Sequence, residues 1–128
     1  MAGPARAGLV VYAKDLERVA SFYERLLGMT RLHARDEIVV LDTPDLQLLV
    51  HRIPDEYAAD IVITSPPERR ADTALKFFFT VASLEAAACT AADLGGALFD
   101  ERWSGPGFVA CNAMDPEGNV FQLREAVG

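Results

Sequence analysis

Few side chains in this sequence combine the residue types and the spacing that catalysis or metal binding requires. The two histidines, His33 and His51, each stand alone, without the spacing of a pair of metal ligands. The two cysteines, Cys89 and Cys111, have no adjacent base, and we expect both to be small buried residues. The sequence has no Ser-His-Asp arrangement and no phosphate-binding loop. Any chemistry must therefore come from isolated polar side chains that the fold brings together.

A turn near the C-terminus is the clearest local structure that could position such side chains. In Met114 to Glu125 (MDPEGNVFQLRE), Asp115 supplies an acceptor side chain, Pro116 fixes φ, and Gly118 occupies the fourth position of a tight turn. The residues after the turn alternate in the manner of a strand. A looser version, Leu41 to Leu48 (LDTPDLQL), occurs earlier in the chain. This echo indicates that one structural module is used twice.

We expect the first module, about residues 7–53, to have the order βαβββ. Asp15 is a suitable N-cap, apolar residues follow at helical spacing, and Gly28 is suited to end the helix. The expected strands are Leu9–Ala13, Thr30–His33, Glu37–Asp42 and Leu46–Arg52. Residues 54–74 contain three prolines and are predicted to be a connector, which could include a short strand at Ile61–Thr64.

The second module, about residues 75–126, repeats the first at an offset that aligns Asp15 with Ser83, another good N-cap. The offset grows between Gln47 and Gln122, so we expect a longer loop at Glu101–Pro106. The expected elements are a strand Lys76–Val81, a helix Leu84–Leu94 and strands Ala97–Asp100, Gly107–Met114 and Val120–Glu125.

Length and composition set the protein class. The chain has 128 residues, of which 51% are hydrophobic and 24% charged, as expected for a single globular domain. Its net charge of −7 and its lack of a basic cluster argue against nucleic-acid binding. No apolar run is long enough to span a membrane, and the N-terminus lacks a secretory apolar segment. Two cysteines do not make a disulfide framework, so we expect a reduced, cytoplasmic protein.

Three segments of the chain carry a family resemblance. Tyr12–Leu16 (YAKDL), Ser21–Gly28 (SFYERLLG) and Asp115–Leu123 (DPEGNVFQL), together with the repeat, resemble the vicinal oxygen chelate superfamily. This group includes glyoxalase I, extradiol dioxygenases, fosfomycin-resistance enzymes and bleomycin-resistance proteins. The resemblance implies an α+β fold of two βαβββ modules in pseudo-twofold tandem repeat, whose curved mixed sheets enclose a cavity. It also implies a homodimer, because dimerisation commonly completes the cavity in this group.

The resemblance also points to four positions at which metal-using members hold their ion. These are the start of the first strand and a site in the last strand of each module, and here they carry Gly8, Gln47, Lys76 and Gln122. Transition-metal sites need several histidine or carboxylate ligands, because amide oxygens are weak donors and an ammonium group repels the ion. We therefore expect no metal and no other cofactor.

Period-two alternation from these positions predicts which side chains face the cavity. Trp103 lies in a loop beside glycines and could cover a ligand as a lid. The opposite faces of the same strands are more apolar, as faces packed against helices should be. The expected ligand-binding residues are Tyr12, Gln47, His51, Lys76, Phe78, Trp103, Gln122 and Arg124.

Each of these residues also has a structural interpretation. Lys76 and Arg124 could extend to the rim, Gln47 and Gln122 could hydrogen-bond each other, and Trp103 could be a dimer contact. Tyr12 and Phe78 could fill the core, and His51 could be an ordinary exposed histidine.

The sequence favours a metal-independent small-molecule-binding protein similar to the bleomycin-resistance type. Because Lys76, Arg124 and His51 would give the wall a positive character, the expected ligand is anionic or aromatic. The alternative is an enzyme, either a glyoxalase-like lyase or isomerase or a dioxygenase, with an unrecognised metal site or with Lys76 or His51 as general base. A further alternative is a non-catalytic accessory domain with a vestigial cavity.

Overall fold

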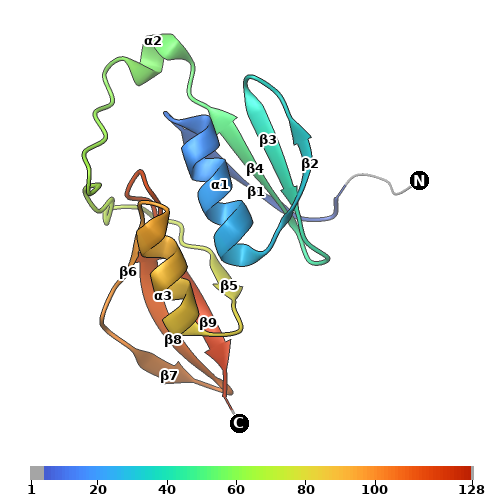
Figure 1. Cartoon of the computed structure of the whole chain (residues 1–128), viewed down its shortest axis with the longest axis vertical. Helices are drawn as coiled ribbons and strands as arrows, with labels where there is room; N and C mark the ends of the chain where they lie inside the picture. The colour runs from blue at the N-terminus through green and yellow to red at the C-terminus, as the bar shows by residue number, and fades with distance from the viewer. Residues whose placement is uncertain (1–4, 128) are drawn as a thin grey trace. The chain divides into compact units, whose positions relative to one another are not determined.

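The computed structural model describes residues 5–127, and the βαβββ order occurs twice within this range (Figure 1). The chain divides into two units, one up to Val62 and one from Ile63. Each unit contains one mixed sheet with a helix packed against it, so the predicted α+β class is confirmed. None of the described helices is long and apolar enough to cross a membrane.

The first unit contains a four-stranded sheet in the order β1-β4-β3-β2. β1 runs parallel to β4, whereas the other neighbours are antiparallel, and β2 has a bulge between Arg31 and His33. The elements are β1 (Gly8–Ala13), α1 (Leu16–Leu27), β2 (Thr30–Ala34), β3 (Ile38–Asp42), β4 (Gln47–Arg52) and the short helix α2 (Asp55–Ala58).

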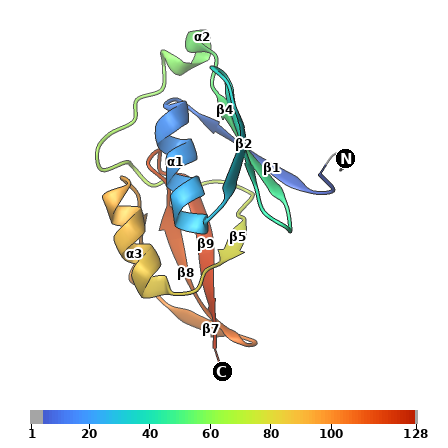
Figure 2. The same ribbon diagram turned by 45° about the vertical axis from the view of Figure 1, so that its right-hand side comes forward.

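The second unit repeats this topology in the order β5-β9-β8-β6, with β5 parallel to β9. An additional strand, β7, pairs with β8 beyond the end of β6. Figure 2 shows α3 to one side of β8 and β9. The elements are β5 (Phe78–Thr80), α3 (Leu84–Asp93), β6 (Ala97–Leu98), β7 (Trp103–Gly105), β8 (Phe108–Met114) and β9 (Val120–Ala126).

Both predicted helix starts are confirmed by side-chain caps. The carboxylate of Asp15 accepts from the Arg18 backbone N–H at 3.2 Å, and the Ser83 hydroxyl accepts from the Ala86 N–H at 3.1 Å. A second acceptor reaches α3 from β9, where Glu125 Oε1 accepts from the Leu84 N–H at 2.7 Å. These bonds satisfy backbone donors that have no partner within the helix.

The helices differ in how much apolar volume they bury. The buried face of α1 is Leu16, Val19, Ala20, Phe22, Tyr23 and Leu26, which repeats at helical spacing. The buried face of α3 is only Leu84, Ala87 and Ala91. The second helix therefore buries less apolar volume than the first.

The predicted turn at Asp115 links β8 to β9 and contacts the connector. The buried carboxylate of Asp115 accepts from the backbone N–H groups of Glu117 (2.9 Å) and Asn119 (3.1 Å). The Gly118 carbonyl accepts from the Arg70 N–H at 2.8 Å. Gly118 has φ of +85°, and a Cβ at this position would lie 1.9 Å from the Glu68 carbonyl oxygen. Glycine is therefore required both by the backbone conformation and by the close approach of the connector.

Three local predictions are wrong. The expected loop at Glu101–Pro106 contains β7, which is too short to recognise without its partner β8. Ile61–Thr64 forms no strand, although α2 occurs just before it. Cys89 is exposed on α3, because the buried stripe of this helix passes through Ala87 and Ala91 instead.

Candidate ligand-binding face of the second sheet

The burial of the strands confirms the predicted division of both sheets into an inner and an outer face. In the first unit, Val11, Leu48 and Val50 are buried towards α1, whereas Val10 and Tyr12 are exposed. In the second unit, the residues packed towards α3 include Cys111, Phe121 and Leu123, which are fully buried. The opposite faces carry the side chains that the sequence predicts to contact a ligand.

Strand register gathers the polar side chains of the second unit on one face. Gln122 pairs with both Phe78 and Asn112, and Arg124 pairs with Ala110, so these positions point to the same side. Lys76 joins them by donating a hydrogen bond from Nζ to Asn112 Oδ1 at 3.2 Å. We refer to Lys76, Phe78, Asn112, Gln122 and Arg124 as the donor face.

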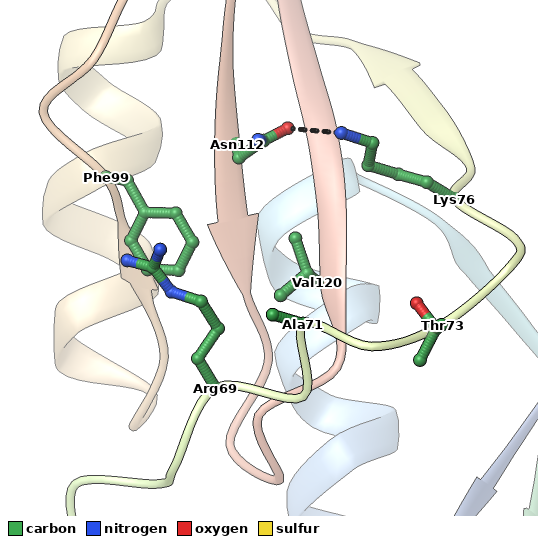
Figure 3. A pocket seen from close by; sticks show the side chains of 7 residues that line it. All are labelled: Arg69, Ala71, Thr73, Lys76, Phe99, Asn112 and Val120. Atoms are coloured by element: carbon green, nitrogen blue, oxygen red, sulfur yellow. Dashed lines mark hydrogen bonds between the residues drawn. The ribbon is translucent and has the colours of Figure 1, made fainter.

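A pocket of about 240 Å³ lies at the Lys76 end of the donor face (Figure 3). On one side of it, the Arg69 guanidinium carbon lies 3.6 Å from the centre of the Phe99 ring, while Lys76 reaches Asn112 on the other. The lining contains two cations and no acid: Arg69, Ala71, Thr73, Lys76, Phe99, Asn112 and Val120.

A second pocket of similar size adjoins the first and shares Arg69, Phe99 and Asn112 with it. Trp103 lines this second pocket together with Asp100 and Glu101. Trp103 pairs with Ala110 through β7, so it lies on the same side of the sheet as the donor face. The structure therefore places Trp103 beside the pocket as a half-buried strand residue.

The hydrogen bonds fix the direction in which the two amides of the donor face present their groups. An ammonium or guanidinium group can only donate, so the oxygen of each amide faces its cation. Asn112 Oδ1 accepts from Lys76, and Gln122 Oε1 accepts from Arg124 Nε at 2.6 Å. The NH₂ groups of both amides therefore remain as donors, and the face offers donors almost exclusively. Such a surface is complementary to an anion.

The remaining predicted residues lie in the first unit. Tyr12 is 59% exposed on β1, and its ring centre lies 5.7 Å from that of His51 on β4. Gln47 begins β4, where it pairs with Gly8. Because these residues belong to a different unit from the donor face, their contribution to a ligand site remains a prediction.

Sequence reasoning missed most of the residues that line the pocket. Arg69, Ala71 and Thr73 lie in the predicted connector, and Phe99 follows the short strand β6. Asn112 was also missed, although strict alternation from Met114 back along β8 places it on the exposed face. No local pattern identifies Arg69, because its position depends on the pairing of Arg70 with Asn119.

The register also revises one of the four positions at which a metal would be expected. Gly8 pairs directly with Gln47. In the second unit, Lys76 is the residue that aligns with Gly8 in sequence. Gln122, however, pairs with Phe78, which is two residues after Lys76. The matching position in β4 is therefore Leu49 rather than Gln47.

Comparison with known proteins identifies the family of the chain. The model of the glyoxalase-like domain family matches residues 8–124. The chain belongs to this family. It is therefore a member of the vicinal oxygen chelate superfamily, as the sequence resemblance predicted. No curated protein matches the sequence.

Solved structures share the fold of this glyoxalase-like protein at low sequence identity. A glyoxalase/bleomycin resistance protein/dioxygenase family enzyme from Burkholderia phytofirmans has a TM-score of 0.70 and 15% identity, over 94% of this chain and 98% of that one. A glyoxalase/bleomycin resistance protein from Albidiferax ferrireducens has a TM-score of 0.67 and 18% identity, over 94% and 98% of the chains. The fosfomycin resistance protein FosX from Listeria monocytogenes has a TM-score of 0.66 and 16% identity, over 99% and 95%.

The side chains at the positions to which the sequence resemblance points do not fit a divalent metal. Gly8 and Leu49 offer no ligand atom, and Lys76 presents an ammonium group. The one candidate oxygen, Gln122 Oε1, already accepts from the Arg124 guanidinium, whose charge would repel a metal ion. Among residues 5–127, no three histidine, cysteine or acidic side chains lie close enough to hold an ion. No step of a mechanism is therefore assigned to a metal.

The shifted pKa values of this glyoxalase-like protein have structural causes. A hydrogen bond from Arg31 Nη1 at 3.0 Å holds the pKa of the Glu17 carboxyl below its ordinary value, and the same contact raises the pKa of Arg31. Burial on the α3 side of β8 raises the pKa of the Cys111 thiol. We interpret Cys111 as a core residue rather than as a nucleophile.

Proposed function

We propose that this glyoxalase-like protein binds an anionic small molecule without a metal, with the acid group of the ligand in the pocket at Lys76 and Asn112. The observation that carries this proposal is the direction of the Lys76–Asn112 hydrogen bond. Because the amide oxygen already accepts from the ammonium group, the remaining Asn112 donors and Lys76 itself are available to a carboxylate.

The surroundings of this pair favour an aromatic acid in particular. The pocket offers the side chains of Phe99 and Val120 as apolar surface, and Arg69 adds a second cation. Aromatic and aliphatic walls with a few convergent polar groups are typical of small-molecule sites. The net charge of the chain is −7, so attraction of an anion depends on short-range contacts in this pocket.

The single tryptophan provides a direct test, because Trp103 lines the adjoining pocket. We expect benzoate to change its fluorescence in a saturable manner, whereas benzylamine at the same concentrations does not. Calorimetry should give the same affinity order. Saturable binding of the amine and not of the acid would contradict the proposal.

A matched pair of lysine variants assigns the effect to the pocket. Lys76→Met should weaken benzoate binding by about tenfold or more, since a charge-assisted hydrogen bond contributes about 1.5–3 kcal/mol. Lys14→Met changes the net charge by the same amount in the other unit and should leave the affinity within about twofold. Equal losses in the two variants would mean that overall charge, and not the pocket, governs binding.

A second candidate function is enzymatic proton transfer, and one observation at His51 favours it. His51 Nδ1 lies 2.8 Å from the backbone carbonyl oxygen of Arg52, which can only accept. In the neutral ring, this contact places the hydrogen on Nδ1 and the lone pair on Nε2, which is the arrangement of a base. Turnover of a bound carbonyl compound that His51→Gln abolishes without loss of binding would favour this function over binding alone.

A further inference from the structure

The Arg124 side chain on β9 contacts two aromatic rings, on the side of the sheet that carries the donor face. Its guanidinium carbon lies 3.7 Å from the centre of the Phe78 ring and 4.2 Å from that of Phe108. Phe78 comes from β5 and Phe108 from β8, so the three side chains converge from three neighbouring strands. Both distances lie within cation–π range, so the two rings restrict where the guanidinium group can lie.

The edge of this guanidinium group that carries the two Nη atoms has a defined direction. Nε donates to Gln122 Oε1 at 2.6 Å, which orients the group about its own plane. Within residues 5–127, the two Nη atoms have neither an ion-pair partner nor a hydrogen-bond acceptor. They form a pre-oriented pair of donors, which matches the two oxygens of a carboxylate.

A purely structural role explains this arrangement less well. The chain has 19 acidic residues, yet none of the described ones pairs with Arg124, although it is only half-buried. Phe78 is 51% exposed, so the contact leaves an aromatic surface open beside the free Nη atoms. An apolar ring next to a planar donor pair can accommodate the body and the acid group of one ligand.

The strand register gives the spacing between this group and the Lys76–Asn112 pocket. Arg124 pairs with Ala110, which is two residues from Asn112 along β8. Two strand residues correspond to roughly 7 Å. Gln122 pairs with Asn112 and lies next to Arg124 on the same face, so its NH₂ group is a further donor beside both sites.

We propose that Arg124, clamped by Phe78 and Phe108, is a second anion-binding site, and that the ligand class is a rigid diacid whose two acid groups lie roughly 7 Å or more apart. One carboxylate binds at Lys76 and Asn112, and the other binds the Nη pair of Arg124. This inference rests on the proposed function, because it takes the first anion site as given.

Two probes of nearly equal shape test the second site. Naphthalene-2,6-dicarboxylate carries two carboxylates at opposite ends of a rigid ring system, whereas 6-carbamoyl-2-naphthoate replaces one of them by a neutral amide. We expect the wild-type protein to bind the naphthalene diacid at least tenfold more tightly than the monoacid by calorimetry. Equal affinities would overturn this inference while leaving the first anion site intact. Failure of both probes to bind would overturn the proposed function itself.

Variants of Arg124 assign any preference to its planar group. The ratio of the two affinities should fall to about one in Arg124→Gln. Arg124→Lys keeps the charge but loses the pair of parallel donors, and it should retain only a small part of the preference. Thermal unfolding of each variant checks that the fold is intact. A tenfold preference that survives in both folded variants would overturn the assignment.

Discussion

At the scale of single residues, the direction of two amide side chains has the largest effect on what the second sheet can bind. From its identity alone, Gln122 could bind a metal through its amide oxygen or an anion through its NH₂ group. The structure adds that Gln122 and Asn112 turn their oxygens towards Arg124 and Lys76. This orientation places a cationic group against each amide oxygen and leaves the two NH₂ groups as donors for an anion.

Gly118 is the residue for which a single methyl group should be most damaging. A Cβ there would lie 1.9 Å from the Glu68 carbonyl oxygen, in addition to the strain of a positive φ. We expect Gly118→Ala to lower the free energy of unfolding by more than about 2 kcal/mol in urea denaturation, and the steric clash should contribute most of this loss.

Gly107 offers the matched control for that substitution. Its φ is +77°, but a Cβ there would have no atom within 4 Å. Gly107→Ala should therefore show only the backbone strain, about 1 kcal/mol. If the two variants lose the same stability, the connector does not approach Gly118 as closely as described.

At the scale of elements, helices were easier to predict than strands. Asp15, Ser83 and the apolar spacing of α1 are local signals, and they gave the helix starts to the residue. β7 and the position of Arg69 depend on partners distant in the sequence, so no local pattern reports them. For the same reason, the sequence identified Lys76, Gln122 and Arg124 but missed Asn112, whose importance comes from its bond to Lys76.

The start of α3 should depend on a side chain from another element. Glu125 accepts from the Leu84 N–H, so Glu125→Ala leaves this donor without its acceptor. We expect thermal and urea unfolding to show a loss of about 1 kcal/mol. Glu125→Gln retains an acceptor oxygen and should lose less. A Gln variant less stable than the Ala variant would contradict this role.

The two cysteines should differ strongly in reactivity. Cys89 is exposed on α3, whereas Cys111 is buried in β8, where burial raises its thiol pKa and so reduces the thiolate fraction at neutral pH. A thiol reagent should label one site rapidly in the native protein and two after denaturation. Cys89→Ser should remove the rapid phase. Rapid labelling of that variant would show that β8 opens readily.

At the scale of the whole molecule, family membership and α+β class followed from repeated local patterns. The turn residues from Asp115 to Asn119 were recognisable because their backbone conformation demands particular residue types. Activity was not predictable in this way, because the family's fold tolerates different side chains at its ligand positions. Here Leu49, Lys76 and Gln122 occupy three of those positions.

The subunit number and the metal content of the intact protein provide a test that no single-residue variant can give. We propose that the protein is a homodimer without a bound transition metal, and native mass spectrometry with metal analysis should report both properties from one untagged preparation. One transition metal per subunit would contradict the metal-independent function. A monomer would contradict the dimer and leave the anion pocket of the second unit unaffected.

The contact between Gly118 and residues 68–70 has a practical consequence for the design of a protein fragment. A recombinant fragment designed to begin at Phe78, where β5 starts, would lack the backbone N–H of Arg70 that the Gly118 carbonyl accepts. It would also lack Arg69, which lines the pocket. A fragment beginning at Ile63 would keep both. A fragment intended to keep the pocket therefore has to include residues 63–77, a stretch whose sequence resembles a dispensable linker.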